Sequence, residues 1–258
     1  MTAAATAAYP MPRERNLILG SLLALAAAAW GLLLWQALMM DGEEMSLTMG
    51  MGAPVFIGLW IAMMVAIMFP TAAPMILMFA RVHNRRRDEG RHFVPTWVFA
   101  SSYLLIWAAA GLAAYGAAVL GDELAGQSMW LMDNAARIGG GVIIAAGLYQ
   151  LSPLKRACLG KCRTPLGFIL GSWRDGAGGS FRMGLEHGVY CLGCCWLLFV
   201  ILFPLGMMNI AALALITLLI FSEKSTPFGR RTADFAAAAL IAYGALVVAV
   251  PDALPTMM

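Results

Sequence analysis

The sequence predicts an all-α, polytopic membrane protein with about seven spanning helices. Of the 258 residues, 61% are hydrophobic and only 12% are charged, whereas a soluble domain carries about 25% charged residues to keep its surface hydrated. Apolar stretches approach or exceed the roughly 20 residues that a bilayer-spanning helix needs, and they recur from end to end of the chain. No stretch is polar enough for a soluble domain, so we expect one integral membrane domain over residues 1–258.

The expected spans cover 17–40, 54–80, 94–120, 136–153, 184–204, 206–221 and 233–250. The fourth and sixth are short for a bilayer. Only Pro204 and Gly206 separate the fifth from the sixth, so residues 184–221 can also form one long kinked span. The first apolar run is too long for a signal peptide, so we expect it to be retained after a short cytoplasmic tail over residues 1–16.

The distribution of charge predicts the orientation. With seven spans, all but one of the 17 Lys and Arg residues fall on a single side, the exception being Arg137. The other side carries the acidic residues Asp41, Glu43, Glu44, Asp122, Glu123, Asp133 and Asp252. Because basic loops stay cytoplasmic, we expect a bacterial inner (plasma) membrane protein with its N-terminus in the cytoplasm and its C-terminus outside. Merging 184–221 into one span would place Lys224, Arg230 and Arg231 outside, which favours two spans.

The strongest chemical signal is a stripe of soft donors in the fifth expected helix. All five cysteines of the chain lie between residues 158 and 195, and an odd, clustered set argues against a disulfide framework. At about 100° per residue, one narrow helix face carries the stripe. Its members are Met183, His187, Cys191 and Cys194, with Cys195 at the edge. Thiolate and thioether donors select Cu(I), zinc or iron–sulfur clusters. The stripe therefore predicts a metal site, the alternative being thiols buried as small packing groups.

A second cysteine pair, Cys158 and Cys162, precedes this helix in a basic segment. At i and i+4 the two thiols share one face if the segment is helical. We expect the neighbouring Lys155, Arg156 and Lys161 to lower the pKa of both thiols. The pair predicts a second metal site or a relay, although a reduced cytoplasmic pair without ligands is the alternative.

Methionine placement adds two further elements. In the second expected helix, a stripe about 80° wide carries Met64, Met68, Met75 and Met78, with Pro70 and Pro74 kinking the helix beside it. We expect Met64 and Met68 to contact the metal, the alternative being core packing. The first outer loop offers thioether and carboxylate donors suited to capturing a soft cation. They are Met39, Met40, Asp41, Glu43, Glu44, Met45, Met49 and Met51.

Several function classes are disfavoured. The chain has no phosphate-binding loop, dinucleotide fingerprint or HExxH motif, and nothing in it indicates a nucleic-acid partner. His83 and His92 lie in an Arg-rich segment and are expected to be solvated. Acidic residues in the spans are confined to Glu186 and Asp234 at helix ends, which disfavours a carrier driven through buried carboxylates.

These motifs resemble a bacterial family described as predicted metal-binding integral membrane proteins, the domain of unknown function 2182. The resemblance lies in WIAMMVAIMFPTAAPM (60–75), GLYQLSPLKRACLGKCRTPLGF (147–168), SWRDG (172–176), HGVYCLGCCW (187–196), GMMN (206–209) and EK (223–224). It covers nearly all of residues 54–230. It implies metal binding through Cys158, Cys162, His187, Cys191, Cys194 and Cys195, and it implies no settled reaction.

The leading hypothesis is a membrane protein that binds Cu(I), in preference to zinc, for copper capture, transfer or cuproenzyme assembly. The outer loop would collect the ion, the methionines of the second helix would conduct it, and the Cys/His stripe would hold it. Besides membrane lipid and the ion, the expected partner is a periplasmic metallochaperone or cuproenzyme. One alternative is a copper-dependent membrane oxidase using His187 and Tyr190 on a lipophilic substrate, although oxygen-activating centres usually draw on several imidazoles. Another is a metal-free membrane scaffold.

Overall fold

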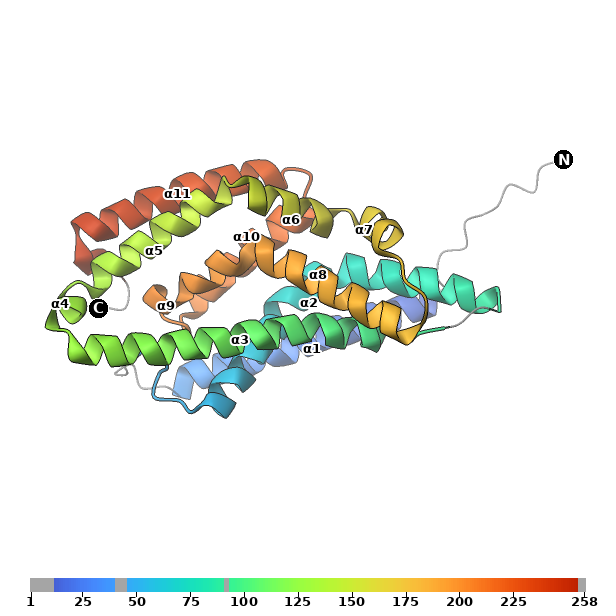
Figure 1. Cartoon of the computed structure of the whole chain (residues 1–258), viewed down its shortest axis with the longest axis horizontal. Coiled ribbons are helices and arrows are strands. Elements are labelled where there is room, and N and C mark those ends of the chain that lie inside the picture. Colours follow the sequence, from blue (N-terminus) through green and yellow to red (C-terminus); the bar gives the residue numbers. More distant parts are fainter. Residues whose placement is uncertain (1–11, 40–45, 91–92, 255–258) are drawn as a thin grey trace.

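The computed structural model describes residues 12–39, 46–90 and 93–254, and the regular secondary structure within these ranges is entirely helical (Figure 1). The helices are α1 (Pro12–Met39), α2 (Ala53–Asp88), α3 (Thr96–Gln127), α4 (Met129–Asp133), α5 (Ala135–Gln150), α6 (Pro153–Arg163), α7 (Pro165–Ser172), α8 (Gly176–Val200), α9 (Leu202–Leu205), α10 (Ile210–Ser225) and α11 (Gly229–Ala249), followed by the 3₁₀ turn η1 (Pro251–Ala253). The all-α prediction is confirmed. Most of the predicted cytoplasmic tail lies outside the described residues.

Among the described residues, five helices are long and apolar enough to cross a membrane. They cover Arg13–Met39, Ala53–Arg87, Thr96–Gln127, Gly176–Leu205 and Gly229–Ala249. The fourth and sixth expected spans form α5 and α10, but each has only 16 residues, fewer than a bilayer usually requires. The number of seven spans therefore stays a prediction.

Helix α2 is the central element of the bundle. In its most apolar stretch 61% of the residues are buried, against 44% or fewer in the other four long helices. Helix α1 runs antiparallel to it, and the Asn84 side chain donates to Glu14 (2.6 Å) where α2 ends and α1 begins. On another side α3 also runs antiparallel to α2, and the Trp60 indole donates to the carbonyl of Trp107 (2.9 Å). Helix α2 continues through Pro70 and Pro74.

Two helix pairs approach at glycines so closely that a side chain would not fit. A Cβ added at Gly184 of α8 would overlap the Phe99 carbonyl and the Ser102 hydroxyl of α3, and one at Gly188 would lie 2.8 Å from Ile106. Because these contacts move forward along α3 as they move forward along α8, the two helices are parallel. Helices α5 and α11 instead pair antiparallel through Gly140, Gly147, Ala237 and Gly244. Small residues permit such close packing between membrane helices.

Residues 184–221 double back instead of forming one kinked span: α8 and the short α9 run one way, and α10 returns. Gly206, at φ +88°, takes a left-handed conformation that glycine adopts readily. The Asn209 side chain then caps α10 by accepting from the amide of Ala212 (3.1 Å). At the far end of α10, the Lys224 ammonium lies 3.0 Å from Cys191 Sγ in the interior of α8, so α10 returns alongside α8.

We expect Gly184→Ala to lower the free energy of unfolding of the chain in detergent by about 1–3 kcal/mol, because the added methyl group forces α3 and α8 apart. Gly178→Ala on the same helix is the matched control, since a Cβ there has no atom within 4 Å. Unfolding followed by circular dichroism measures both. Equal stability of the two variants would contradict the close packing of α3 on α8.

Candidate metal centre

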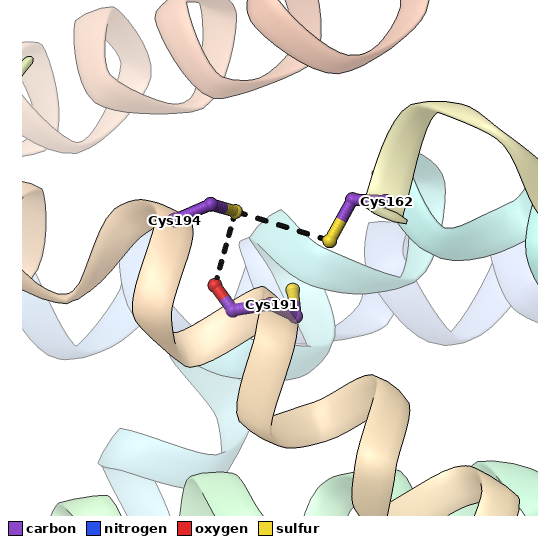
Figure 2. Close-up of side chains that lie close together, drawn as sticks. All are labelled: Cys162, Cys191 and Cys194. Atoms are coloured by element: carbon purple, nitrogen blue, oxygen red, sulfur yellow. Dashed lines mark hydrogen bonds between the residues drawn. The ribbon is translucent and has the colours of Figure 1, made fainter. Parts of the chain in front are cut away.

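Three thiols from two helices converge in the interior of the bundle. The Sγ atoms of Cys162 on α6 and of Cys191 and Cys194 on α8 all lie within 4.8 Å of one another (Figure 2). Cys162 Sγ and Cys194 Sγ are 4.0 Å apart. Three sulfurs arranged around a metal at about 2.3 Å are about 4.0 Å apart in a trigonal plane. The cluster therefore has nearly the spacing of a trigonal thiolate site.

Helical geometry and local hydrogen bonds orient the thiols of α8. Cys191 and Cys194 are one turn apart, and the Cys194 thiol contacts the Cys191 carbonyl at 3.1 Å (Figure 2). Cys195 contacts the same carbonyl at 2.8 Å, and its sulfur is 3.8 Å from Cys194 Sγ. All three cysteines are about 1% exposed. Cys195 therefore borders the three-thiol group, as its place at the edge of the predicted stripe implies.

Helix α6 packs against α8 at a glycine of α8. A Cβ on Gly193 would stand 2.8 Å from Cys158 Sγ, so a larger residue there would force the Cys158 side chain to move. Cys158 thus packs on α8 beside the cluster, while Cys162, one turn later, enters it. The three-thiol group does not include Cys158.

A thioether from the central helix α2 also lies beside the three-thiol group. Met68 Sδ lies 3.8 Å from Cys191 Sγ, and its side chain is fully buried. Met64, one turn earlier on α2, is fully buried in the same hydrophobic core. Of the two methionines predicted to contact the metal, the structure thus brings Met68 to the thiols.

Two polar neighbours of Cys191 were missed by sequence reasoning. Lys224 Nζ lies 3.0 Å from Cys191 Sγ and 3.6 Å from Met68 Sδ, and the Tyr103 hydroxyl lies 3.1 Å from the same thiol. Lys224 was expected in a loop, but α10 extends to Ser225 and turns the side chain inward. A lysine closing a long apolar run was the available signal; for Tyr103 the sequence holds none.

A buried ion pair anchors α6. Lys155 Nζ donates to Glu223 Oε2 at 2.7 Å, and Gln150 donates to the other carboxylate oxygen at 3.0 Å. The two charged side chains are 1–2% exposed. The network joins α5, α6 and α10, and it places a buried carboxylate where sequence analysis expected none.

The expectation of lowered thiol pKa values on α6 is wrong. Burial, followed by the nearby Cys194, raises the pKa of Cys158. Hydrogen bonds with Cys191 and Cys194, together with burial, raise the pKa of Cys162. The reason is geometric, since the Lys155 ammonium is already bound to Glu223 and the thiols face the interior.

The imidazole of His187 lies among aromatic rings instead of within the three-thiol group. Its ring centroid is 5.4 Å from those of Tyr103 and Phe168 and 5.9 Å from that of Phe99. The structure therefore divides the predicted stripe. Cys191 and Cys194 enter the cluster, whereas His187 lies one turn nearer the start of α8.

His83 is buried, contrary to the expectation of a solvated side chain. It is 1% exposed, because α2 runs on past it and the rings of Phe79 and Trp173 cover it at 4.4 and 5.1 Å. His92 lies outside the described residues.

Much of the expected outer capture loop, residues 40–45, also lies outside the described residues. Met49 and Met51 are partly buried against the core. The Asp122 carboxylate fixes the loop that carries them by accepting from the amides of Leu47 (2.7 Å) and Thr48 (3.1 Å).

Comparison with known proteins identifies a matching family. A family model described as PpoB2, copper chaperone, matches residues 57–247. No curated protein and no solved structure matches the chain. The match confirms the expected relation to copper, under a description that differs from the domain of unknown function 2182 that the motifs resemble.

We expect Lys155→Met to destabilise the chain by about 3–5 kcal/mol, because it leaves the Glu223 carboxylate buried and unpaired. The double variant Lys155→Met/Glu223→Met should recover most of this loss. Arg156→Met is the matched control, since that side chain on α6 is exposed. Thermal unfolding in detergent checks all three, and a control as unstable as Lys155→Met would contradict the buried ion pair.

Proposed function

Because the chain belongs to the copper chaperone family, we propose that it holds Cu(I) within the membrane through Cys162, Cys191 and Cys194 and hands the ion on. The observation that carries the proposal is the convergence of three thiol sulfurs, all within 4.8 Å of one another. Copper is the cargo of such a protein, so the site must bind the ion and also release it.

The donor set favours Cu(I) over the other soft-donor metals. Thiolates and thioethers are the ligands that Cu(I) prefers, and Cys191 has a thioether neighbour in Met68. Structural zinc sites normally require four Cys or His ligands in a tetrahedron, and the three-thiol group falls one short. The group also lacks the several imidazoles of oxygen-activating copper centres, which favours a holding site over an oxidase.

Lys224 supports a thiolate site in apolar surroundings. Three thiolates and one Cu(I) carry a formal charge of −2 (−3 + 1), and an adjacent ammonium reduces this to −1. Lys224 Nζ lies within hydrogen-bonding distance of Cys191 Sγ (3.0 Å). In this proposal Met68 is a fourth, weaker donor. The remaining predicted donors, Cys158, Cys195, His187 and Met64, lie outside the ligand set proposed for the bound ion.

The proposal also covers the location of the chain, its orientation in the membrane and its partner. Five helices of membrane length are compatible with a multi-pass membrane protein, and the basic loops favour the bacterial inner membrane with a cytoplasmic N-terminus. The outer methionine and carboxylate loop would then exchange copper with a periplasmic metallochaperone or cuproenzyme.

We expect the purified wild-type chain to bind one Cu(I) at the cluster, and Cys162→Ser and Cys194→Ser each to weaken binding by about tenfold or more, since each removes a thiolate. Elemental analysis measures stoichiometry, and competition with a Cu(I) chelator measures affinity. Cys158→Ser is the matched control. It carries the same substitution on the same helix as Cys162, at a thiol outside the three-thiol group.

Wild-type protein without copper would refute the proposal and support a metal-free scaffold. Equal losses in Cys158→Ser and Cys162→Ser would instead enlarge the ligand set to both thiols of α6. Consumption of oxygen by the copper-loaded protein, dependent on a lipophilic substrate, would favour the oxidase.

The orientation is tested separately. We expect a reporter active only in the cytoplasm to function when fused at the N-terminus and to fail at the C-terminus, because the basic segments remain inside. A periplasmic reporter should give the reverse result. Both termini on the same side would rule out seven spans.

A further inference from the structure

Two buried histidines each have a ring nitrogen without a partner. Among the described residues, only four buried side-chain nitrogen or oxygen atoms lack a hydrogen bond, and two of them are Nδ1 of His83 and Nδ1 of His187. Leaving such a group unsatisfied costs about 1–3 kcal/mol, so each instance calls for an explanation. An imidazole nitrogen with an available lone pair is a copper ligand.

His83 of α2 lies beside the start of α8, and His187 lies further along α8 itself. His83 Nε2 lies 3.4 Å from the hydroxyl of Ser180, and Met183, His187 and Cys191 continue the same helix face at one-turn intervals. Each interval of four residues advances about 6 Å along the axis. These four residues of α8 and His83 are all 2% exposed or less.

The walls of this route are aromatic and offer few competing donors. The rings in contact with the two imidazoles belong to Phe79, Phe99, Tyr103, Phe168 and Trp173. At the basic end of the bundle, Arg86 covers the Trp173 ring at 4.6 Å and pairs with Asp175. The buried side chains thus lead from the basic end of the bundle to the thiol cluster.

We propose that His83, Met183 and His187 form a stepwise path by which Cu(I) passes between the basic end of the bundle and the Cys162–Cys191–Cys194 cluster. Each step is a ligand exchange in which one nitrogen–copper or sulfur–copper bond forms as another breaks, and copper remains Cu(I) throughout. The neutral imidazoles and the thioether bind the ion more weakly than three thiolates do, so they pass it on. This inference rests on the proposed function and adds the route.

Silver provides a direct test, because Ag(I) is a redox-inert analogue of Cu(I). The full chain, labelled with ¹⁵N-histidine, is titrated in detergent, with resonances assigned through His83→Phe and His187→Phe. We expect the first equivalent to protect the thiols from alkylation and to leave the imidazoles largely unchanged. Further silver should shift the ring nitrogens of His187 and His83.

The exchange rate provides the second readout. Copper-loaded His187→Phe and His83→Phe should retain the wild-type stoichiometry and equilibrium affinity, but transfer copper to a soluble chelator about tenfold more slowly, as expected for about 1.4 kcal/mol of added barrier. Phe168→Leu is the matched control, since it disturbs packing beside His187 without removing a donor. It should exchange at the wild-type rate.

The possible outcomes distinguish failure of the proposed path from failure of the proposed copper site. Thiols protected by silver while both imidazoles remain unshifted in excess silver would overturn the path and leave the site intact. Wild-type exchange rates in both histidine variants would also overturn it. Thiols that remain reactive with silver present would refute the proposed function, and the path with it.

Discussion

Thiols on two helices converge only if those helices are held at a fixed separation. In this chain the buried pair of Lys155 and Glu223 holds α6 against α10, and the neighbouring Lys224 of α10 contacts Cys191 of α8. Removing two charges from water is costly, and the cost is offset only when the partners meet in good geometry. The pair satisfies this at 2.7 Å, with Gln150 on the second carboxylate oxygen. Because α6 has one position in which Lys155 is satisfied, Cys162 also has one position relative to α8.

Local periodicity explains which features could be predicted from the sequence. The helical class follows from the apolar runs, and the shared face of Cys191 and Cys194 follows from the helical repeat alone. The entry of Cys162 into the same cluster depends on how α6 packs against α8, which no local pattern encodes. The contact of Tyr103 with Cys191, at 3.1 Å, likewise joins residues 88 positions apart.

The differences from the sequence-based predictions arise mostly at helix ends. Hydropathy places the end of a helix where charge begins, yet α2 and α10 continue into their charged segments. His83 and Lys224 therefore lie on helices that face the protein interior. The shortness of α5 and α10, in contrast, was expected from the length of their apolar runs. Charged residues near the end of an apolar run thus require tertiary information before they are assigned to solvent.

The close contact of α3 with α8 at Gly184 and Gly188 makes the two halves of the cluster mechanically unequal. Helix α8 has no room to slide against α3, so Cys191 and Cys194 belong to the stiff part of the molecule. Helix α6 has only 11 residues and starts at Pro153, with Pro165 opening the next helix. Any motion that separates the thiols therefore requires α6 to move, and such a motion also has to strain the buried ion pair of Lys155 with Glu223.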